Sequence, residues 1–188
     1  MRTATLNGTL CVLLMTVAVA TARAAPDPAL VGWWRLDAGQ GTAIRDLSGN
    51  GNDGTVVGAR WRKAARGSEL FFDGAGDYVD CGQSPALAGL TDDFSVLAWV
   101  KLDGGATEVS NFYVAENETY HQNGFMMRVD GALGKLTIRG SSKGRNGAGF
   151  SQRIVPQDRW CMVGMSVHDR QGTMYVDGER DLTHALGE

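Results

Sequence analysis

The chain has 188 residues and a formal net charge of −3 at pH 7, from 18 basic and 21 acidic residues. This length suits one domain that buries about two thirds of its unfolded surface. The mild acidity argues against nucleic acid and anionic membranes as partners, because basic surfaces bind those polyanions.

The amino terminus has the features of a secretory signal. Arg2 precedes an apolar stretch at 10–20, and the small-residue site Ala22-Arg23-Ala24 follows it. This pattern predicts that residues 1–24 are a signal peptide and that the domain spans 25–188, in a secreted, periplasmic or cell-surface protein. Its removal takes away two arginines and no acid, which leaves 16 basic and 21 acidic residues and a charge of −5. The stretch is too short to cross a hydrocarbon core of about 30 Å, so no membrane insertion is expected.

Most of the remaining chain consists of short apolar or alternating runs separated by turns. Asp-Gly is a strong hairpin signal because both residues tolerate positive φ. Such pairs occur at Asp53-Gly54, Asp73-Gly74, Asp103-Gly104, Asp130-Gly131 and Asp177-Gly178. Strands are predicted at 32–36, 69–72, 78–81, 94–102, 125–129, 136–139, 160–167 and 173–176. The pattern indicates an all-β sandwich or barrel.

Four segments allow finer predictions. In 160–167 alternate residues are apolar, which indicates a half-buried strand, whereas 94–102 is apolar on both faces and indicates a central strand covered on both sides. Residues 84–90 suit one short helical turn, and the glycine-rich segment 140–149 suits an exposed mobile loop.

The five tryptophans divide into two groups. Trp34, Trp99 and Trp160 lie in predicted strands and are expected to fill the core, while Trp33 and Trp61 are expected to be partly exposed. None is a clear platform for a sugar ring.

Six short motifs occur in the order found in a known family. They are Leu30-Val31-Gly32-Trp33-Trp34-Arg35-Leu36-Asp37, Asp46-Leu47-Ser48-Gly49-Asn50-Gly51-Asn52-Asp53-Gly54, Phe72-Asp73-Gly74 with Asp77-Tyr78-Val79, Phe94-Ser95-Val96-Leu97-Ala98-Trp99-Val100, Arg159-Trp160-Cys161, and Met174-Tyr175-Val176-Asp177-Gly178. With these motifs the chain resembles the laminin-G-like jelly rolls of the concanavalin A-like lectin and glucanase superfamily. The resemblance implies two antiparallel sheets packed face to face, with loops at one rim available for ligands. Family domains continue for about forty residues past the last motif, so the domain is expected to be incomplete at its C-terminal end, where an uncovered sheet edge would favour instability or dimerisation.

Two cysteines remain after removal of the signal peptide, Cys81 and Cys161. Disulfides persist outside the cytoplasm, and a bridge between these residues would contribute about 4–5 kcal/mol to stability in the chain-entropy model. The alternative is two buried, unpaired thiols. Pentraxin-like relatives place a cysteine in the strand that corresponds to 94–100, where this chain has none.

The second motif places side-chain oxygens at alternate positions before a glycine, as hard cations prefer in a tight loop. One calcium ion is therefore a candidate cofactor, with Asp46, Asn50, Asn52 and Asp73 as ligands. The alternative is that these side chains make turn hydrogen bonds to the backbone. A helix-loop-helix calcium site is excluded because Val57 occupies the position that would need a bidentate glutamate.

The segment 111–123 mixes aromatic residues with amides and carboxylates, a combination that suits sugar recognition. Tyr113, Asn117 and Tyr120 are the predicted ligand contacts, and the alternative is a strand followed by an ordinary solvated loop. Glucanases of the superfamily carry catalytic carboxylates at alternate positions of one strand, and Glu116 and Glu118 have that spacing, but the fuller Glu-x-Asp-x-x-Glu pattern is absent.

These observations favour an exported, non-catalytic binding module that recognises a glycan or an extracellular protein through rim loops. Two alternatives stay open. One is a glycoside hydrolase that uses Glu116 and Glu118, and the other is a purely structural module of a larger surface protein. No catalytic residue is assigned to the leading hypothesis.

Overall fold

The computed structural model describes residues 27–90, 93–103, 111–116, 125–142 and 145–186, without the side chains of 111–116 and 140–148. Regular structure in these ranges is almost entirely β-strand, and every pair of neighbouring strands is antiparallel. The one described helix, α1 (Pro85–Ala88), follows Ser84, whose Oγ accepts a hydrogen bond from the Leu87 amide at 3.2 Å. The predicted helical turn at 84–90 is therefore confirmed.

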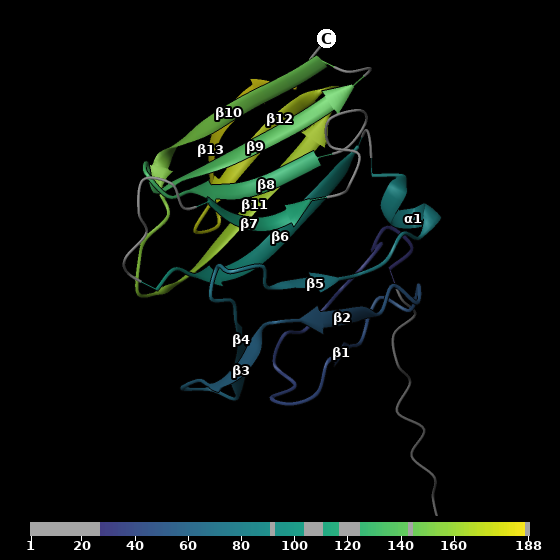
Figure 1. Cartoon of the computed structure of the whole chain (residues 1–188). Helices are drawn as coiled ribbons and strands as arrows, with labels where there is room; N and C mark the ends of the chain where they lie inside the picture. Colours follow the sequence, from purple (N-terminus) through teal and green to yellow (C-terminus); the bar gives the residue numbers. More distant parts are fainter. Residues whose placement is uncertain (1–26, 91–92, 104–110, 117–124, 143–144, 187–188) are drawn as a thin grey trace, which may run out of the picture.

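Two four-stranded sheets form the larger part of the molecule. The first runs in the order β13 (Glu179–Ala185), β12 (Gln171–Val176), β11 (Trp160–His168) and β6 (Phe94–Lys101). The second runs in the order β10 (Arg145–Ile154), β9 (Lys135–Ser142), β8 (Phe125–Asp130) and β7 (Asn111–Glu116). They pack face to face (Figure 1), with β9 and β10 in contact with β12. This confirms the predicted two-sheet jelly-roll sandwich.

The core lies between these sheets and follows from the alternation along each strand. In β11 the apolar positions Cys161, Val163, Met165 and Val167 are buried, as the sequence predicts. The opposite sheet contributes Phe125, Met127, Val129, Leu136 and Ile138 to the same cluster. Full burial of such side chains stabilises the fold by about 1.5–3 kcal/mol each.

A smaller unit precedes the sandwich along the chain. It holds the three-stranded sheet β1 (Ala43–Ile44), β2 (Gly54–Val57) and β5 (Tyr78–Asp80), and the hairpin of β3 (Arg60–Lys63) and β4 (Ser68–Phe71). Figure 1 shows these strands below the two large sheets. No helix in the described part of the chain is long and apolar enough to cross a membrane.

Two sequence predictions about β6 and its tryptophan are wrong. The strand is the last of its sheet rather than a central one, because its only described neighbour is β11. Its residues alternate between half-buried and exposed, and Trp99 is 66% exposed. Trp160, also expected in the core, is 44% exposed. Trp34 is half-buried, and Trp33 and Trp61 are partly exposed as expected.

The loop predicted at 140–149 is instead the hairpin of β9 and β10, with Gly140 opposite Gly147 and Ile138 opposite Gly149. One of its glycines, Gly149, marks a close approach of two strands. A Cβ atom at Gly149 would lie 2.0 Å from Cδ2 of His184, so the β13 imidazole occupies the space that a side chain would need. Glycine thus lets β10 approach β13.

Candidate functional site

An apolar surface lies on the outer face of β6 and β11, opposite the core. It consists of Leu97 (62% exposed), Trp99, Trp160 and the half-buried Met162, and is called the tryptophan face below. Met162 pairs with Trp99, and Trp160 pairs with Lys101. Because diagonal neighbours on a sheet face lie about 7–8 Å apart, the two indoles are close enough to contact one ligand.

Charged side chains border this face where β11 begins and β12 ends. The Arg159 guanidinium donates a hydrogen bond to Asp177 Oδ2 at 2.7 Å, and the Asp177 amide donates to the Met162 carbonyl at 2.7 Å. The hydrogen bond from Arg159 lowers the pKa of Asp177 below its ordinary value. An ionised carboxylate and a guanidinium therefore stand beside the aromatic surface, where they can bond polar groups of a ligand.

The tryptophan face continues along β11 to Gly164, which has no side chain to cover its neighbours. A Cβ at Gly164 would lie 2.5 Å from Cδ2 of Leu97, so the leucine side chain lies over the glycine backbone. Gly164 also pairs with Tyr175 on β12, whose hydroxyl lies 3.4 Å from Ser166 Oγ. Glycine here leaves room for Leu97 to lie flat and extends the apolar surface toward a tyrosine.

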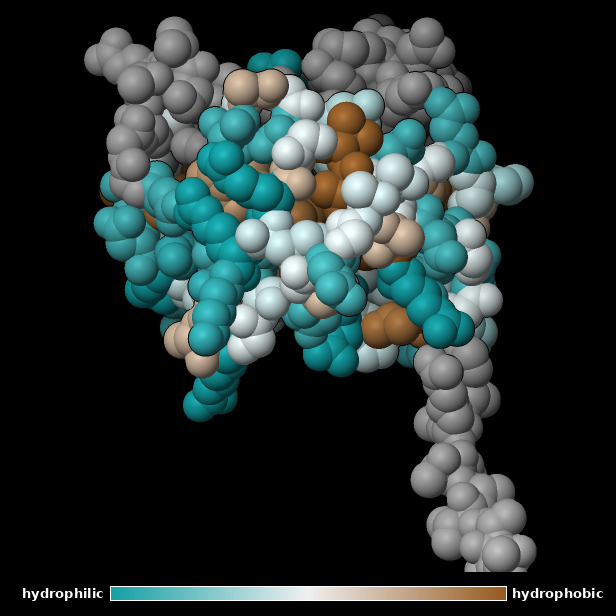
Figure 2. Space-filling model, turned by 60° about the horizontal axis from the view of Figure 1, so that its bottom comes forward, coloured by the Kyte–Doolittle hydropathy of each residue, from teal (hydrophilic) through white to brown (hydrophobic). Residues whose placement is uncertain are grey.

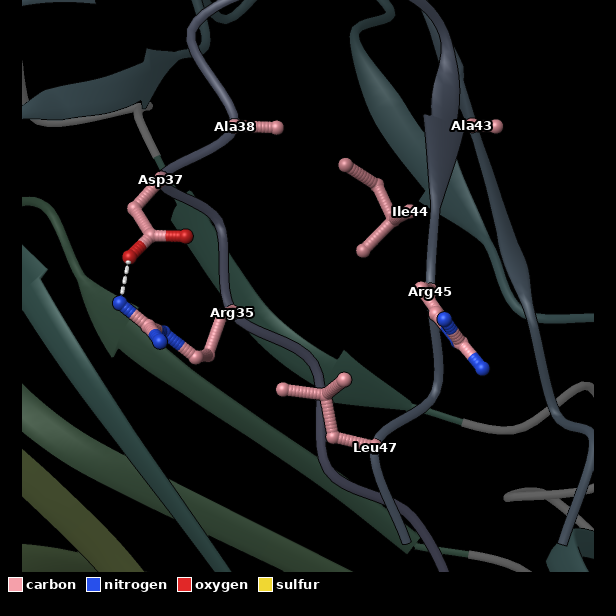
Figure 3. A pocket seen from close by; sticks show the side chains of 7 residues that line it. All are labelled: Arg35, Asp37, Ala38, Ala43, Ile44, Arg45 and Leu47. Carbon is pink, nitrogen blue, oxygen red and sulfur yellow. Dashed lines mark hydrogen bonds and ion pairs between the residues drawn. The ribbon is translucent and has the colours of Figure 1, made fainter. Parts of the chain in front are cut away.

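A second candidate site is a cavity of about 230 Å³ in the smaller unit that precedes the sandwich, called the N-terminal unit below (Figure 3). It is lined by Arg35, Asp37, Ala38, Ala43, Ile44, Arg45 and Leu47. Arg35 and Asp37 form an ion pair on one wall, and Ile44 and Leu47 project from the other segment. Ligand cavities usually measure about 300–1,000 Å³. Figure 2 shows the molecule with the bottom of Figure 1 brought forward, and in this view hydrophobic residues lie among hydrophilic ones.

The predicted calcium loop is held by its own hydrogen bonds. Asp46 Oδ1 accepts from the amides of Trp33 and Ser48, and Oδ2 accepts from the Ser48 hydroxyl and the Asn52 amide, at 2.8–3.0 Å. Burial raises the pKa of Asp46, but these hydrogen bonds outweigh it, so the pKa is lower than 3.8. Since a carboxylate has about four acceptor sites, Asp46 offers no free lone pair to a cation.

The other predicted calcium ligands, Asn50, Asn52 and Asp73, also make hydrogen bonds within turns or to neighbouring segments. The amide nitrogens of Asn50 and Asn52 donate to the carbonyl of Val31, at 3.1 and 2.8 Å. Asp73 lies in the turn before β5, where its Oδ1 accepts from the Ala75 amide. No group of three or more His, Cys, Asp or Glu side chains in the described residues could hold a metal ion. These hydrogen bonds fit the stabilised turn that is the alternative stated above. Asn52 Oδ1 is buried without a hydrogen-bond partner in the described residues, and the calcium ion stays a prediction.

The predicted rim contacts lie largely outside the described residues. Tyr113 belongs to β7, where it pairs with Arg128, but its side chain is not described. Asn117 and Tyr120 fall in the segment 117–124, which the description does not include. The same holds for Glu118, while Glu116 ends β7. These contacts and the alternate carboxylates therefore stay predictions.

The expected bond between Cys81 and Cys161 is not formed, which corrects the disulfide prediction. The two thiols lie in different parts of the fold. Cys161 is fully buried in β11, opposite Val100 of β6, whereas Cys81 follows β5 in the smaller sheet. Burial raises the pKa of Cys81 to about 11 and also raises that of Cys161, so both residues are protonated and poorly reactive near pH 7.

Reductant is accordingly expected to leave the thermal unfolding of the protein unchanged. In the folded protein Cys81 and Cys161 should resist iodoacetamide at pH 7, because both thiols are protonated and Cys161 is buried. Mass spectrometry of peptides alkylated before and after unfolding measures this difference. A cross-linked peptide that contains both cysteines, with a loss of about 4–5 kcal/mol on reduction, would contradict it.

Residues 73–188 match the family described as the Concanavalin A-like lectin/glucanases superfamily. The chain belongs to this superfamily. The match begins at the motif Phe72-Asp73-Gly74 and includes both large sheets of the sandwich, hence the whole tryptophan face.

Two solved structures are similar to this chain at low sequence identity. One is an S-layer domain-containing protein from Clostridium thermocellum, with a TM-score of 0.52 and 19% identity over 84% of this chain and 73% of the other. Another is the carbohydrate binding module CBM66 from Bacillus subtilis, with a TM-score of 0.46 and 12% identity over 72% of this chain and 80% of the other. No curated protein matches the sequence.

Proposed function

We propose that this concanavalin A-like domain is an exported, non-catalytic module that binds carbohydrate through the tryptophan face. The observation that carries the proposal is the exposure of Trp99 and Trp160 on one sheet face. Indole rings are flat and apolar with a polar N–H at the edge, so they cover the apolar faces of sugar rings while neighbouring polar groups bond the hydroxyls. Arg159 and Asp177 supply such polar groups beside Trp160.

The described carboxyl groups with a shifted pKa are Asp46 and Asp177, and both shifts are downward. Both groups therefore hold their negative charge near pH 7, and Asp177 can accept hydrogen bonds from a ligand beside the tryptophan face. The carboxylates of the glycosidase hypothesis, Glu116 and Glu118, lie outside the described side chains.

Replacement of Trp99 by alanine is expected to weaken binding of a soluble polysaccharide by about ten- to thirtyfold, because a buried Trp contact contributes about 1.4–2 kcal/mol or more. Trp160→Ala should have a similar effect and the double variant a larger one. Calorimetric titration against a panel of neutral and acidic oligosaccharides measures the affinities. Trp33→Ala is the matched control, since Trp33 is 49% exposed but lies in the N-terminal unit.

Other results of the same titration would favour the other hypotheses. Wild-type affinity in the double variant would move the site to the rim loop, where Tyr113→Ala and Asn117→Ala test the predicted contacts. A folded protein that binds no oligosaccharide would favour a structural module. Release of reducing sugar that Glu116→Gln abolishes would support the glycosidase.

A further inference from the structure

The tryptophan face continues across the first sheet into a polar half. Alternate residues of β11 and β12 belong to the core, so the residues between them project outward. Pairing of the four strands, which lie side by side in Figure 1, aligns the outward residues in rows that cross the sheet. One row is Leu97, Gly164, Tyr175 and Arg180, and the next is Ser95, Ser166, Thr173 and Thr183.

Hydroxyl groups form most of this polar half, and they contact one another. Thr173 Oγ1 lies 2.9 Å from Thr183 Oγ1, and the Arg180 guanidinium donates to Thr183 Oγ1 at 3.0 Å. The Tyr175 hydroxyl makes a longer contact of 3.4 Å with Ser166 Oγ. The four hydroxyl residues, Ser166, Thr173, Tyr175 and Thr183, are called the hydroxyl surface below.

The hydroxyl surface can bond a ligand in addition to itself. Each hydroxyl has one donor proton and two acceptor sites. The hydrogen bond between Thr173 and Thr183 uses one proton, so whichever residue donates it, the second proton of the pair is left for another acceptor. Sugar hydroxyls are donors and acceptors at once, so they can bond both the proton and the acceptor sites of such a pair.

The rows are open to solvent at both ends. Leu97 and Trp99 on β6 are 62% and 66% exposed, and Arg180 on β13 is exposed as well. The residues of the hydroxyl surface between them are half-buried, whereas the residues that alternate with them on β11 and β12 are fully buried in the core. A ligand can therefore reach the indoles and the hydroxyls together.

The width of the sheet sets the length of such a ligand. Neighbouring strands lie about 4.7–4.9 Å apart, so three intervals separate β6 from β13 by about 14 Å. One sugar unit of an extended chain covers about one of these intervals. A saccharide that contacts Trp99 at one end and Thr183 at the other therefore contains at least three units.

The two halves of the surface also select the shape of the saccharide. Indole rings pack best on sugar faces that carry only C–H groups. In β-1,4-linked chains of glucose-type sugars all substituents are equatorial, so the ring faces are apolar and the hydroxyls lie along the edges of an extended ribbon. Such a ribbon can place its ring faces on Trp99 and Leu97 and its edges on the hydroxyl surface, whereas a helical α-1,4-linked chain curves away from a sheet.

We propose that the outer face of the first sheet binds a β-1,4-linked chain of at least three equatorially substituted sugars, which crosses the strands from Trp99 to Thr183. The inference rests on the proposed function, because it takes the tryptophan face as the saccharide site. It adds the hydroxyl surface to that site and names the linkage and the minimum length of the ligand.

The first experiment measures affinity against chain length. Oligosaccharides of glucose, N-acetylglucosamine and xylose, all β-1,4-linked and two to six units long, are titrated into the full chain and followed by tryptophan fluorescence. In a series that binds, affinity should rise about tenfold or more from the disaccharide to the tetrasaccharide and then stay level. Malto-oligosaccharides, which are α-1,4-linked, are the control for shape and should bind about tenfold more weakly.

The second experiment repeats the titration with variants of the hydroxyl surface. Thr183→Val removes one hydroxyl at nearly constant volume, so it should weaken binding of the tetrasaccharide about three- to tenfold and leave the disaccharide unchanged. Tyr175→Phe should act in the same direction. Thr55→Val is the matched control, because Thr55 is an exposed threonine on β2 of the N-terminal unit. Thermal unfolding verifies that each variant folds, and if the valine variant does not, Thr183→Ser should retain binding.

The outcomes separate this inference from the proposed function. Equal affinity for disaccharide and tetrasaccharide, or a length effect that Thr183→Val and Tyr175→Phe leave intact, would remove the hydroxyl surface from the site. Loss of disaccharide binding in Trp99→Ala would still support the proposed function in that case. Malto-oligosaccharides that bind equally well would overturn the extended chain. Absence of binding in all three β-1,4-linked series would overturn the inference, and acidic oligosaccharides would remain the test of the proposed function.

Discussion

Replacement of Asp46 by alanine is expected to lower the free energy of unfolding by about 3–4 kcal/mol. The Asp46 carboxylate is 5% exposed and accepts four hydrogen bonds, which tie the segment at Trp33 to the turn at Ser48 and Asn52. Hydrogen bonds to a charged group contribute about 1.5–3 kcal/mol each, and the effects of several lost together are not additive. Urea unfolding followed by tryptophan fluorescence measures the change.

The same carboxylate makes stability depend on acid pH. Its pKa is lower in the folded protein than the ordinary value of 3.8, so its contribution is complete above about pH 4–5 and is lost as the pH falls below 3.8 toward the folded pKa. Asp46→Asn should lose this acid dependence, because the amide does not titrate. Unfolding curves at pH 7, 4 and 2.5 for the two proteins measure the difference.

Asp73→Ala is the control for the Asp46 prediction. Asp73 was predicted as a calcium ligand on the same grounds, but it is exposed and bonds only within its own turn, so its loss should cost less than about 1 kcal/mol. Chelation of divalent cations should leave the unfolding transition of the wild type unchanged. A lower transition temperature after chelation, or equal effects of the two variants, would contradict the hydrogen-bonded loop and support a bound cation.

The sequence was sufficient to predict which elements form and much of what they bury. Alternation in β11 correctly identified Cys161, Val163, Met165 and Val167 as core residues, because a strand has two faces and only one of them was apolar throughout. The turn at Asp46 was also predicted from its residue types. Short polar side chains beside glycine stabilise a turn whether they bind a calcium ion or bond the backbone. These are local properties.

The functional surfaces could not be predicted in the same way, because they depend on partners distant in the sequence. Alternation shows that Trp99 shares a face with Leu97, but it does not show whether another layer covers that face. Trp99 and Trp160 come together only through the register of β6 and β11, and a slip of one residue would turn their side chains to opposite faces.

Truncation of Met165 to alanine is expected to destabilise the domain by about 2–5 kcal/mol. The Met165 side chain is 0% exposed, and β11 places it between Val96 of β6 and Met174 of β12. Its loss removes buried apolar surface and leaves a cavity between two sheets that cannot easily collapse. In a domain that spans residues 25–188 such a change lowers the transition temperature by roughly 5–15 °C, which scanning calorimetry measures.

Leu97→Ala on the neighbouring strand is the matched control, because it removes a similar apolar volume from the opposite face of the same sheet. With 62% of Leu97 exposed, its truncation should cost less than about 1 kcal/mol. A loss comparable with that of Met165→Ala would mean that the outer face of β6 is covered in solution, as its apolar sequence indicated. The tryptophan face would then be buried and unable to bind a saccharide, so this pair of stability measurements also tests the binding site before any ligand is known.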